Sequence, residues 1–365
     1  MTSLGRMVVK LACKSCSETV RWAYFRRMTG RNAWLLVALV VANLVLFMLH
    51  LLVGPVPLDT GDAMAGLFGL DDGSGPGRIV RAVRLPEALT AVLAGSGLAV
   101  CGLLMQTLFR NPLAGPSVLG LSSGASLGVA VLMLARPLWL LAWMPAEFSV
   151  IVGAFVGAMA VLALIMLADK RMGDGVALLV VGLMVGYLCG AIIDVLQVAG
   201  PEGALKGYVL WGMGSFGGVV NERLPLLAVV VLPGLFVALW SMKALNALLL
   251  GETYAASLGV DVPRTRRTIM WTTGLLAGSI TAFCGPIAFL GLATPHVARG
   301  LCRTSDHTTL LPITLLTGAS LALCCDLIIK LPGAAGLPLN AVTALLGAPV
   351  VAWVLWSGKS WARTA

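Results

Sequence analysis

Long runs without a single Asp, Glu, Lys or Arg recur along this chain, and they restrict its possible folds more than any other feature. Residues 33–53 and 113–134 are two such runs. A helix of roughly 20 apolar residues is long enough to cross the hydrocarbon core of a bilayer. Charged residues make up only 11% of the chain, against about a quarter in soluble domains. The chain is therefore predicted to be an all-α polytopic membrane protein.

The apolar runs predict about ten membrane-spanning helices. They cover residues 33–53, 88–108, 113–134, 148–168, 176–195, 224–242, 268–283, 286–301, 309–329 and 341–357. The seventh and eighth share one uncharged run, which is divided at Cys284-Gly285-Pro286. A Gly-Pro pair could instead kink a single long helix. We expect a basic tail at 1–32, a transmembrane domain at 33–358 and a short tail at 359–365.

The basic residues indicate how the chain is oriented. Most of the 25 lysines and arginines fall in the tail before the first span and in alternate loops. Arg264, Arg266 and Arg267, before the seventh span, add to this excess. Cytoplasmic loops of membrane proteins carry such an excess, so both termini are expected in the cytoplasm. The net charge of +9 is then a topology signal, and nucleic-acid binding is not expected.

The cysteines do not predict a metal site. Most of the eight lie in or at the ends of apolar spans, where cysteine packs as a small hydrophobe. Cys13 and Cys16 have zinc-like spacing, but a structural zinc site takes four ligands and no second pair lies nearby. The chain is expected to hold no metal.

A nucleotide site is not expected either. Residues 357–360 read SGKS, like the end of a phosphate-binding loop. The earlier glycine that this motif requires is replaced by Trp353. Any work driven by ATP must therefore come from a separate subunit.

Catalytic groups are also missing from the predicted spans. The three histidines are not paired at ligand spacing, and His296 is expected to make a helix-end or loop hydrogen bond. Enzymes that work within a membrane need paired carboxylates, or a nucleophile with a base. The spans contain no carboxylate pair in the sequence, so neither catalytic residues nor an enzymatic activity is predicted.

One polar segment, residues 110–114 (RNPLA), stands between two apolar spans. Pro112 should end the preceding helix, and Asn111 can satisfy backbone groups that the break frees. A polar break between lipid-length helices can line a pathway. A purely structural kink is the alternative.

Glycines recur at every fourth residue in several spans. Gly120, Gly124 and Gly128 form one such series, and Gly153 and Gly157 form another. Small residues on one helical face let backbones approach closely in lipid, so a compact bundle is predicted.

A short internal echo also occurs. Residues 115–121 (GPSVLGL) resemble residues 285–292 (GPIAFLGL). Many transporters consist of two related halves, although one short match leaves a repeat open here.

Four sequence blocks, taken in order, resemble a known family. They are Arg84-Leu85-Pro86, then Gln106 to Gly124 with RNPLAGPSVLG, then Gly251-Glu252 to Leu258-Gly259-Val260, and Gly291-Leu292 with Pro295-His296 and Arg299. Together they resemble the FecCD family, the permease subunits of ABC importers for iron chelates, haem and cobalamin. The resemblance extends over residues 34–357 and implies a type II ABC importer fold, with 33–358 as the permease domain.

The resemblance implies a coupling segment at about residues 243–267, where short helices dock on the partner ATPase. The residues that match it are Gly251, Glu252, Ala255, Leu258 and Gly259. The alternative is an ordinary amphipathic loop resting on the bilayer surface.

A cytoplasmic gate is also implied by the resemblance, in two segments. Asn111 and Leu113 match the first segment, at the polar break. Asp174, Gly175 and Val176 occupy the second segment, between the fourth and fifth spans.

Basic residues on the outer face are implied to dock the substrate-binding protein. Arg84 and Lys330 stand at such positions, and Arg81 lies one helical turn before Arg84. Lys330 could instead be neutralised by Asp326 at i,i+4 spacing. The family often has a second arginine after Arg84-Leu85-Pro86, where this chain has Glu87.

A second departure lies near the last span. The family usually has Glu-Leu-Pro-Val-Gly, where this chain has Gly-Leu-Pro-Leu-Asn at residues 336–340. This puts in doubt any role carried over for that glutamate, but not the fold.

These observations lead to one expected function. The chain is expected to be a permease of the bacterial inner membrane that imports an iron-siderophore, with haem or cobalamin as the alternative. Its expected partners are two ATPases that bind ATP and Mg, a periplasmic binding protein and a second permease copy. A secondary transporter driven by an ion gradient is a more distant alternative, with Asp194 and Asp326 as its span-end candidates.

Overall fold

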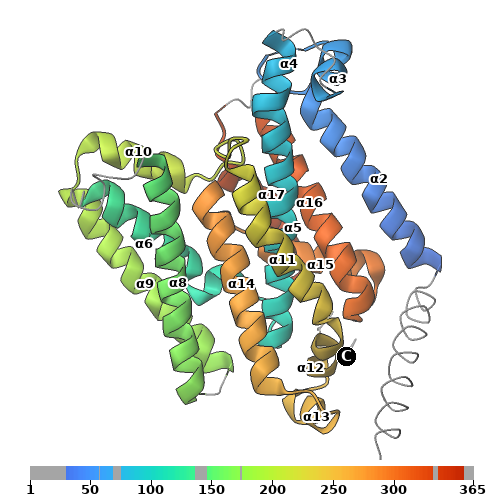
Figure 1. Ribbon diagram of the computed structural model, residues 1–365. Coiled ribbons are helices and arrows are strands. Elements are labelled where there is room, and N and C mark those ends of the chain that lie inside the picture. Colours follow the sequence, from blue (N-terminus) through green and yellow to red (C-terminus); the bar gives the residue numbers. More distant parts are fainter. Residues whose placement is uncertain are drawn as a thin grey trace, which may run out of the picture.

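The computed structural model describes residues 30–56, 58–68, 75–135, 146–172, 175–331 and 336–356 (Figure 1). These residues form helices joined by loops and contain no strand, so the all-α prediction is confirmed. The helices are α2 (Gly30–Leu52), α3 (Thr60–Phe68), α4 (Gly75–Ile79), the π-helical turn η1 (Val80–Arg84), α5 (Leu85–Leu108), the 3-10 turn η2 (Pro116–Leu119), α6 (Leu121–Leu134), α8 (Ala146–Met172), α9 (Gly175–Ala199), α10 (Glu202–Gly212), α11 (Leu224–Trp240), α12 (Met242–Leu249), α13 (Glu252–Ser257), α14 (Val262–Cys284), α15 (Leu290–Cys302), α16 (His307–Lys330) and α17 (Leu339–Trp356).

Each predicted span overlaps a helix, but the helices differ in length, and α6 covers only the second part of the predicted span 113–134. Among the helices of the described residues, five are long and apolar enough to cross a bilayer, or six if α11 and α12, bent by 53° at their junction, form one broken span. The short helices α6 and α15 have 14 and 13 residues. At 1.5 Å per residue each is about 20 Å long, less than the roughly 30 Å of a hydrocarbon core. The bundle therefore combines full-length and partial crossings.

The uncharged run from Thr268 to Val297 is divided into two helices, as predicted. The first, α14, ends at Cys284, and α15 begins at Leu290. Gly285 between them has a φ of +74°, and a Cβ there would lie 2.4 Å from the carbonyl oxygen of Trp211. Only glycine fits this turn without strain. Both echo segments thus connect a long helix to a short one, α5 to α6 and α14 to α15.

Helix α5 lies at the centre of the bundle and contacts α11, α14, α15 and α16 (Figure 1). The helices α4, η1 and α5 follow one another without a break, and 83% of their most apolar stretch of residues is buried inside the protein. The corresponding share in α2 is 11%. Close backbone approach makes this burial possible. A Cβ on Gly102 would lie 1.6 Å from the carbonyl oxygen of Gly291, and one on Gly95 would lie 2.4 Å from that of Gly318.

A second group of helices, α6, α8, α9 and α10, packs beside this centre (Figure 1). The predicted glycine stripes form the contact between α6 and α8. A Cβ on Gly128 would lie 2.0 Å from the carbonyl oxygen of Gly153, and one on Gly157 would lie 2.1 Å from that of Gly124. These stripes therefore pack helices within the chain, as small residues do in membranes.

The two ends of the bundle differ in what they carry. One end holds α3, α4 and the start of α5; the opposite end holds α12, α13 and the start of α14 (Figure 1). We call them the α3 end and the α13 end. Predicted functional residues lie at both.

Replacing Gly102 with alanine should destabilise the bundle, because α5 and α15 would have to move apart to admit the methyl group. We expect a loss of about 1–3 kcal/mol, the usual cost of overpacking, seen as a lower unfolding temperature in detergent. The control is Gly190→Ala in α9, where a Cβ would meet nothing within 4 Å. An unchanged midpoint for Gly102→Ala would contradict the described crossing of α5 and α15.

Candidate functional site

The polar segment after α5 forms a sharp break at the α13 end. Arg110 has a φ of +46°, a left-handed conformation that is uncommon outside glycine. Pro112 cannot continue the helix, because it has no backbone N–H. The side-chain oxygen of Asn111 accepts a hydrogen bond from the backbone N–H of Leu113 at 2.9 Å. The expected bonding role of Asn111 is confirmed, and its role in a gate stays a prediction.

Side chains of α5 and α15 hold this break in place. Nε2 of His296 lies 2.8 Å from the carbonyl oxygen of Pro112. Nη1 of Arg299 donates to Oε1 of Gln106 at 2.6 Å, and Nε2 of Gln106 donates to the carbonyl of Leu292 at 3.2 Å. The loop hydrogen bond expected of His296 is therefore present. It ties the polar segment to α15.

The two predicted gate segments lie beside each other. Gly175 begins α9, and a Cβ on it would lie 3.3 Å from the ring of Phe109, the residue that caps α5. Val176 and Leu113 are 68% and 40% exposed. Asp174 lies outside the described residues. The end of α5 and the start of α9 are thus placed where a constriction could form between them.

The predicted coupling segment is a short helix between two left-handed glycines. Gly251 has a φ of +108° and precedes α13, and Gly259 has a φ of +84° and follows it. Ala255 is buried and anchors the helix. Leu258 and the unpredicted Tyr254 are more than half exposed. The segment therefore projects from the bundle with apolar side chains on its surface.

Glu252 connects this helix to the rest of the bundle. Its Oε1 accepts a hydrogen bond from Nη1 of Arg266 in α14 at 3.1 Å. Arg266 also pairs with Asp169 near the end of α8. From the sequence, Arg266 was expected to be a topology signal only, and its contact with Glu252 was not predicted.

The loop before α16 provides another junction at the α13 end. Oδ1 of Asn246 in α12 lies 2.9 Å from Nδ1 of His307, and its amide donates to Asp306 at 2.6 Å. Burial acts to raise the pKa of Asp306, but hydrogen bonds from Thr308 and Asn246 outweigh it and hold this pKa below its usual value. Asp306 therefore stays ionised as the cap of α16 and fixes α12 against it.

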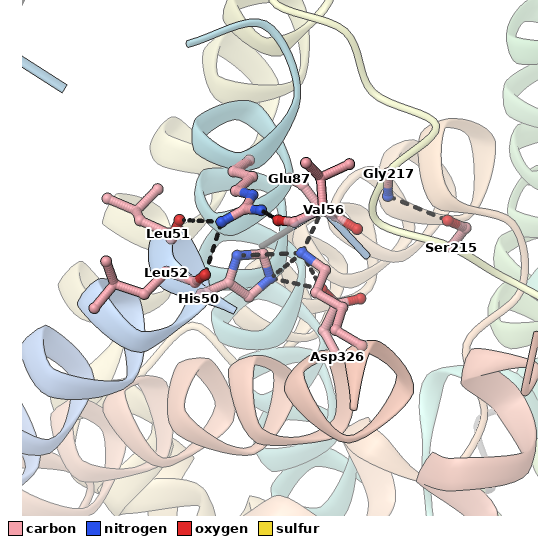
Figure 2. A network of polar contacts seen from close by, with 10 residues as sticks. His50, Leu51, Leu52, Val56, Glu87, Ser215, Gly217 and Asp326 are labelled. Atoms are coloured by element: carbon pink, nitrogen blue, oxygen red, sulfur yellow. Dashed lines mark hydrogen bonds and ion pairs between the residues drawn. The ribbon is translucent and has the colours of Figure 1, made fainter. Parts of the chain in front are cut away.

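At the α3 end, Arg84 is buried rather than displayed. It is 3% exposed, and its guanidinium donates to the carbonyl oxygens of Leu51, Leu52 and Val56 (Figure 2). Leu51 and Leu52 stand in the last turn of α2, whose carbonyls a basic side chain can satisfy, and Val56 follows in the loop. A docking contact by Arg84 would first have to break this arrangement. Arg81, one turn away, is partly exposed.

Lys330 is also buried, in a cluster with the side chains of His50, Glu87 and Asp326. Its Nζ lies 2.5 Å from Oε2 of Glu87, 3.3 Å from Oδ2 of Asp326 and 3.0 Å from Nε2 of His50. His50 and Asp326 are themselves 2.6 Å apart (Figure 2). The predicted neutralisation by Asp326 is therefore present. The docking roles of Arg81, Arg84 and Lys330 stay predictions.

This cluster contains a carboxylate pair that the sequence did not predict. The sequence showed no carboxylate pair within any span, but the structure joins Glu87 of α5 to Asp326 of α16. Their oxygens and Nε2 of His50 all lie within 4.8 Å of one another. No local pattern indicated this pair, because Glu87 precedes the predicted span 88–108 and the two acids, 239 residues apart, come together only when α5 crosses α16. Lys330 is the cation that the two carboxylates share.

Other predictions concern residues that the structure does not describe. Cys13, Cys16 and the tail at 1–29 lie outside the described residues, as does the tail at 359–365. The described cysteines are Cys101, Cys189, Cys284, Cys302, Cys324 and Cys325, and each has a free thiol. Their positions on apolar helices agree with packing as small hydrophobes.

Comparison with known proteins identifies the family. Residues 41–357 match the FecCD transport family. The chain belongs to this family. It is 38% identical to the hemin transport system permease protein HmuU of Yersinia pestis over 276 residues, which are 75% of this chain and 81% of HmuU. It is 37% identical to the vitamin B12 import system permease protein BtuC of Klebsiella pneumoniae, over 75% of this chain and 81% of BtuC.

A solved structure supports the same assignment. An inward-facing conformation of a metal-chelate type ABC transporter matches with a TM-score of 0.77 and 28% identity, over 88% of this chain and 98% of that chain. The FecCD protein described here is thus an ABC importer permease with the fold expected from its sequence.

Replacing Lys330 with methionine should leave Glu87 and Asp326 close together without their shared cation. Breaking a buried ion pair in this way costs about 3–5 kcal/mol, so the unfolding temperature in detergent should fall clearly. Lys330→Arg should retain most of the stability, and Lys206→Met, at an exposed position of α10, is the control. Full stability of Lys330→Met with weakened binding-protein affinity would favour the docking role.

Proposed function

We propose that this permease carries a metal chelate across the bacterial inner membrane in a complex with two ATPases, a second permease copy and a periplasmic binding protein. The observation that supports this proposal most directly is the match to the FecCD family over residues 41–357. The similarity to a metal-chelate type transporter over 88% of the chain supports it. ATP and Mg would bind on the partner ATPases, and the chain itself would carry no cofactor and bind no nucleic acid.

The substrate is proposed as an iron-siderophore, haem or cobalamin. The sequence favoured a siderophore, whereas the relatives compared are permeases for hemin and vitamin B12. Haem and cobalamin are therefore proposed as substrates on equal terms with a siderophore. All three are bulky chelates for which a largely apolar pathway is suitable, since the spans contain few ionisable residues.

The α13 end is proposed to face the cytoplasm and the α3 end the periplasm. Arg264, Arg266 and Arg267 lie beside α13, in agreement with the positive-inside rule. The exposed apolar residues of α13 support docking on an ATPase at Gly251, Glu252, Ala255, Leu258 and Gly259. Asn111, Leu113, Gly175 and Val176, at the same end of the bundle, are proposed as gate residues.

At the periplasmic end, Arg81 is the best supported of the proposed docking residues, because it is more exposed than Arg84. Surface ion pairs contribute typically under about 1 kcal/mol each. Such contacts would orient the binding protein more than hold it.

Reconstitution in liposomes with the candidate ATPase and binding protein tests this function. Uptake of labelled ferric siderophore, haem and cobalamin is measured in parallel, with and without ATP. ATP-dependent uptake of one chelate names the substrate. An ATPase activity that no loaded binding protein stimulates, with no uptake of any chelate, would contradict the proposal. Uptake that follows an ion gradient without ATP would favour a secondary transporter.

Replacing Glu252 with arginine should separate ATP hydrolysis from uptake. The new side chain would face Arg266, and repulsion would displace the first turn of α13 from α14. We expect ATP hydrolysis to persist and uptake per ATP to fall at least about fivefold, the lower range of a coupling energy between sites. Glu202→Arg, an exposed acid at the start of α10, is the control. Wild-type uptake by Glu252→Arg would remove Glu252 from the coupling segment.

A further inference from the structure

Arg266 differs from the basic residues around it. The side chain of Arg264 is 84% exposed and pairs with Asp261 on the same turn, and Arg267 is also exposed. The side chain of Arg266 is 10% exposed. A topology signal needs only charge near the membrane end, so it explains the exposed arginines but not the buried one.

The contacts of Arg266 join four parts of the bundle. Its Nε donates to Oδ1 of Asp169 in α8 at 2.7 Å, and its Nη1 donates to Oε1 of Glu252 in α13 at 3.1 Å. Its guanidinium carbon lies 6.0 Å from the ring centre of Phe109, at the end of α5. This distance is within the range of a cation–π contact. One side chain of α14 therefore touches α8, α13 and α5.

Phe109 extends this connection to the proposed gate. A Cβ on Gly175 would lie 3.3 Å from its ring, so Phe109 stands between Arg266 and the first residue of α9. Phe109 also immediately precedes the polar segment that begins with Arg110. A Cβ on Gly251 would lie 3.7 Å from Nη1 of Arg110. The coupling segment therefore approaches the polar break directly at Gly251, as well as through Arg266 and Phe109.

A cavity lies beside Arg266, between the end of α8 and α13. Its volume is about 260 Å³, and its lining includes Met166, Asp169, Lys170, Glu252, Val262 and Arg266. Side chains in a close-packed interior cannot move independently, because no space separates them. The end of α8 and the start of α13 are therefore separated by open space beside Arg266.

We propose that Arg266 is the positioning residue that links α13 to the proposed gate. This inference rests on the function proposed above. Through Glu252 the Arg266 side chain follows the coupling segment, and through Asp169 and Phe109 it sets the ends of α8 and α5. The planar guanidinium suits this role, because its donors can bind two carboxylates while its face lies against a ring. Lysine has a single ammonium group and cannot make all three contacts in this geometry.

Docking of an ATPase would strengthen the link. The side chain of Glu252 is half exposed, whereas those of Arg266 and Asp169 are mostly buried. Covering α13 would remove water from the Glu252–Arg266 pair and lower the local dielectric. The attraction between opposite charges rises as the dielectric falls. The link would therefore be firmest when the partner that drives transport is bound.

Arg266→Gln and Arg266→Lys in the complete reconstituted complex test this inference, with Arg267→Gln as the matched control. Chelate transported per ATP hydrolysed is measured, together with basal ATP hydrolysis and assembly with the ATPase. We expect Arg266→Gln to assemble and hydrolyse ATP while this ratio falls at least about fivefold. Arg266→Lys should fall less, and Arg267→Gln should match the wild type.

The double variant Glu252→Gln with Arg266→Gln separates a link from two independent effects. If the residues act through their contact, the double variant is no worse than the worse single variant; independent effects would multiply. A wild-type ratio in Arg266→Gln overturns the inference, as does an equal loss in Arg267→Gln. If Arg266→Gln does not assemble, a wild-type ratio in both Arg266→Lys and Glu252→Gln overturns it. Absence of uptake in the wild type would instead contradict the proposed function.

Discussion

The fold depends on helices whose backbones approach more closely than any side chain but glycine allows. Gly95 meets Gly318 and Gly102 meets Gly291, so α16 and α15 lie directly against α5. Within a bilayer the lipid tails are as apolar as the side chains, and burial of apolar surface gives little drive for helices to associate. Association relies on dispersion contacts, which become numerous only when backbones come close. Helix α5 is consequently held closely against its neighbours along its middle.

The polar groups of the bundle are distributed in agreement with this constraint. At the α3 end, Arg84 and Lys330 are enclosed with Glu87, Asp326 and His50, and they fix α2 and α16 to the start of α5 (Figure 2). At the α13 end, hydrogen bonds to α15 hold the break after α5. An unpaired polar group in the apolar region would cost several kcal/mol, and both sets supply their own partners. The apolar middle then offers few polar contacts to a cargo, which agrees with delivery of the substrate by the proposed binding protein.

Much of this arrangement could be predicted from the sequence, because it is encoded locally. The apolar runs predicted the helices of the ten spans, but not α3, α4 or α10, and Gly285-Pro286 indicated the break between α14 and α15. The spacing of Asp326 and Lys330 predicted their contact, since residues four apart share a helix face. Contacts between distant segments were not accessible in the same way. His50 and Glu87 join the cluster only because α2 and α5 both pack against α16. No local sequence pattern predicts which helices pack together. The departure from the family pattern at Glu87 was the one available signal, since an acid at that position needs a cation nearby.

Arg266 is a second residue whose contacts could not be predicted from the sequence. A rule based on charge counts treats every arginine of a loop alike, because orientation depends on their sum. Burial distinguishes one of them, and burial is decided by where α8, α13 and α5 end. A permease driven by a separate ATPase must receive force at a surface outside the membrane and pass it to helices that are packed closely along their middles. The proposed site for this transfer is the end where several helices terminate together and where space remains between them. The cavity beside Arg266 and the exposed helix α13 meet at that end.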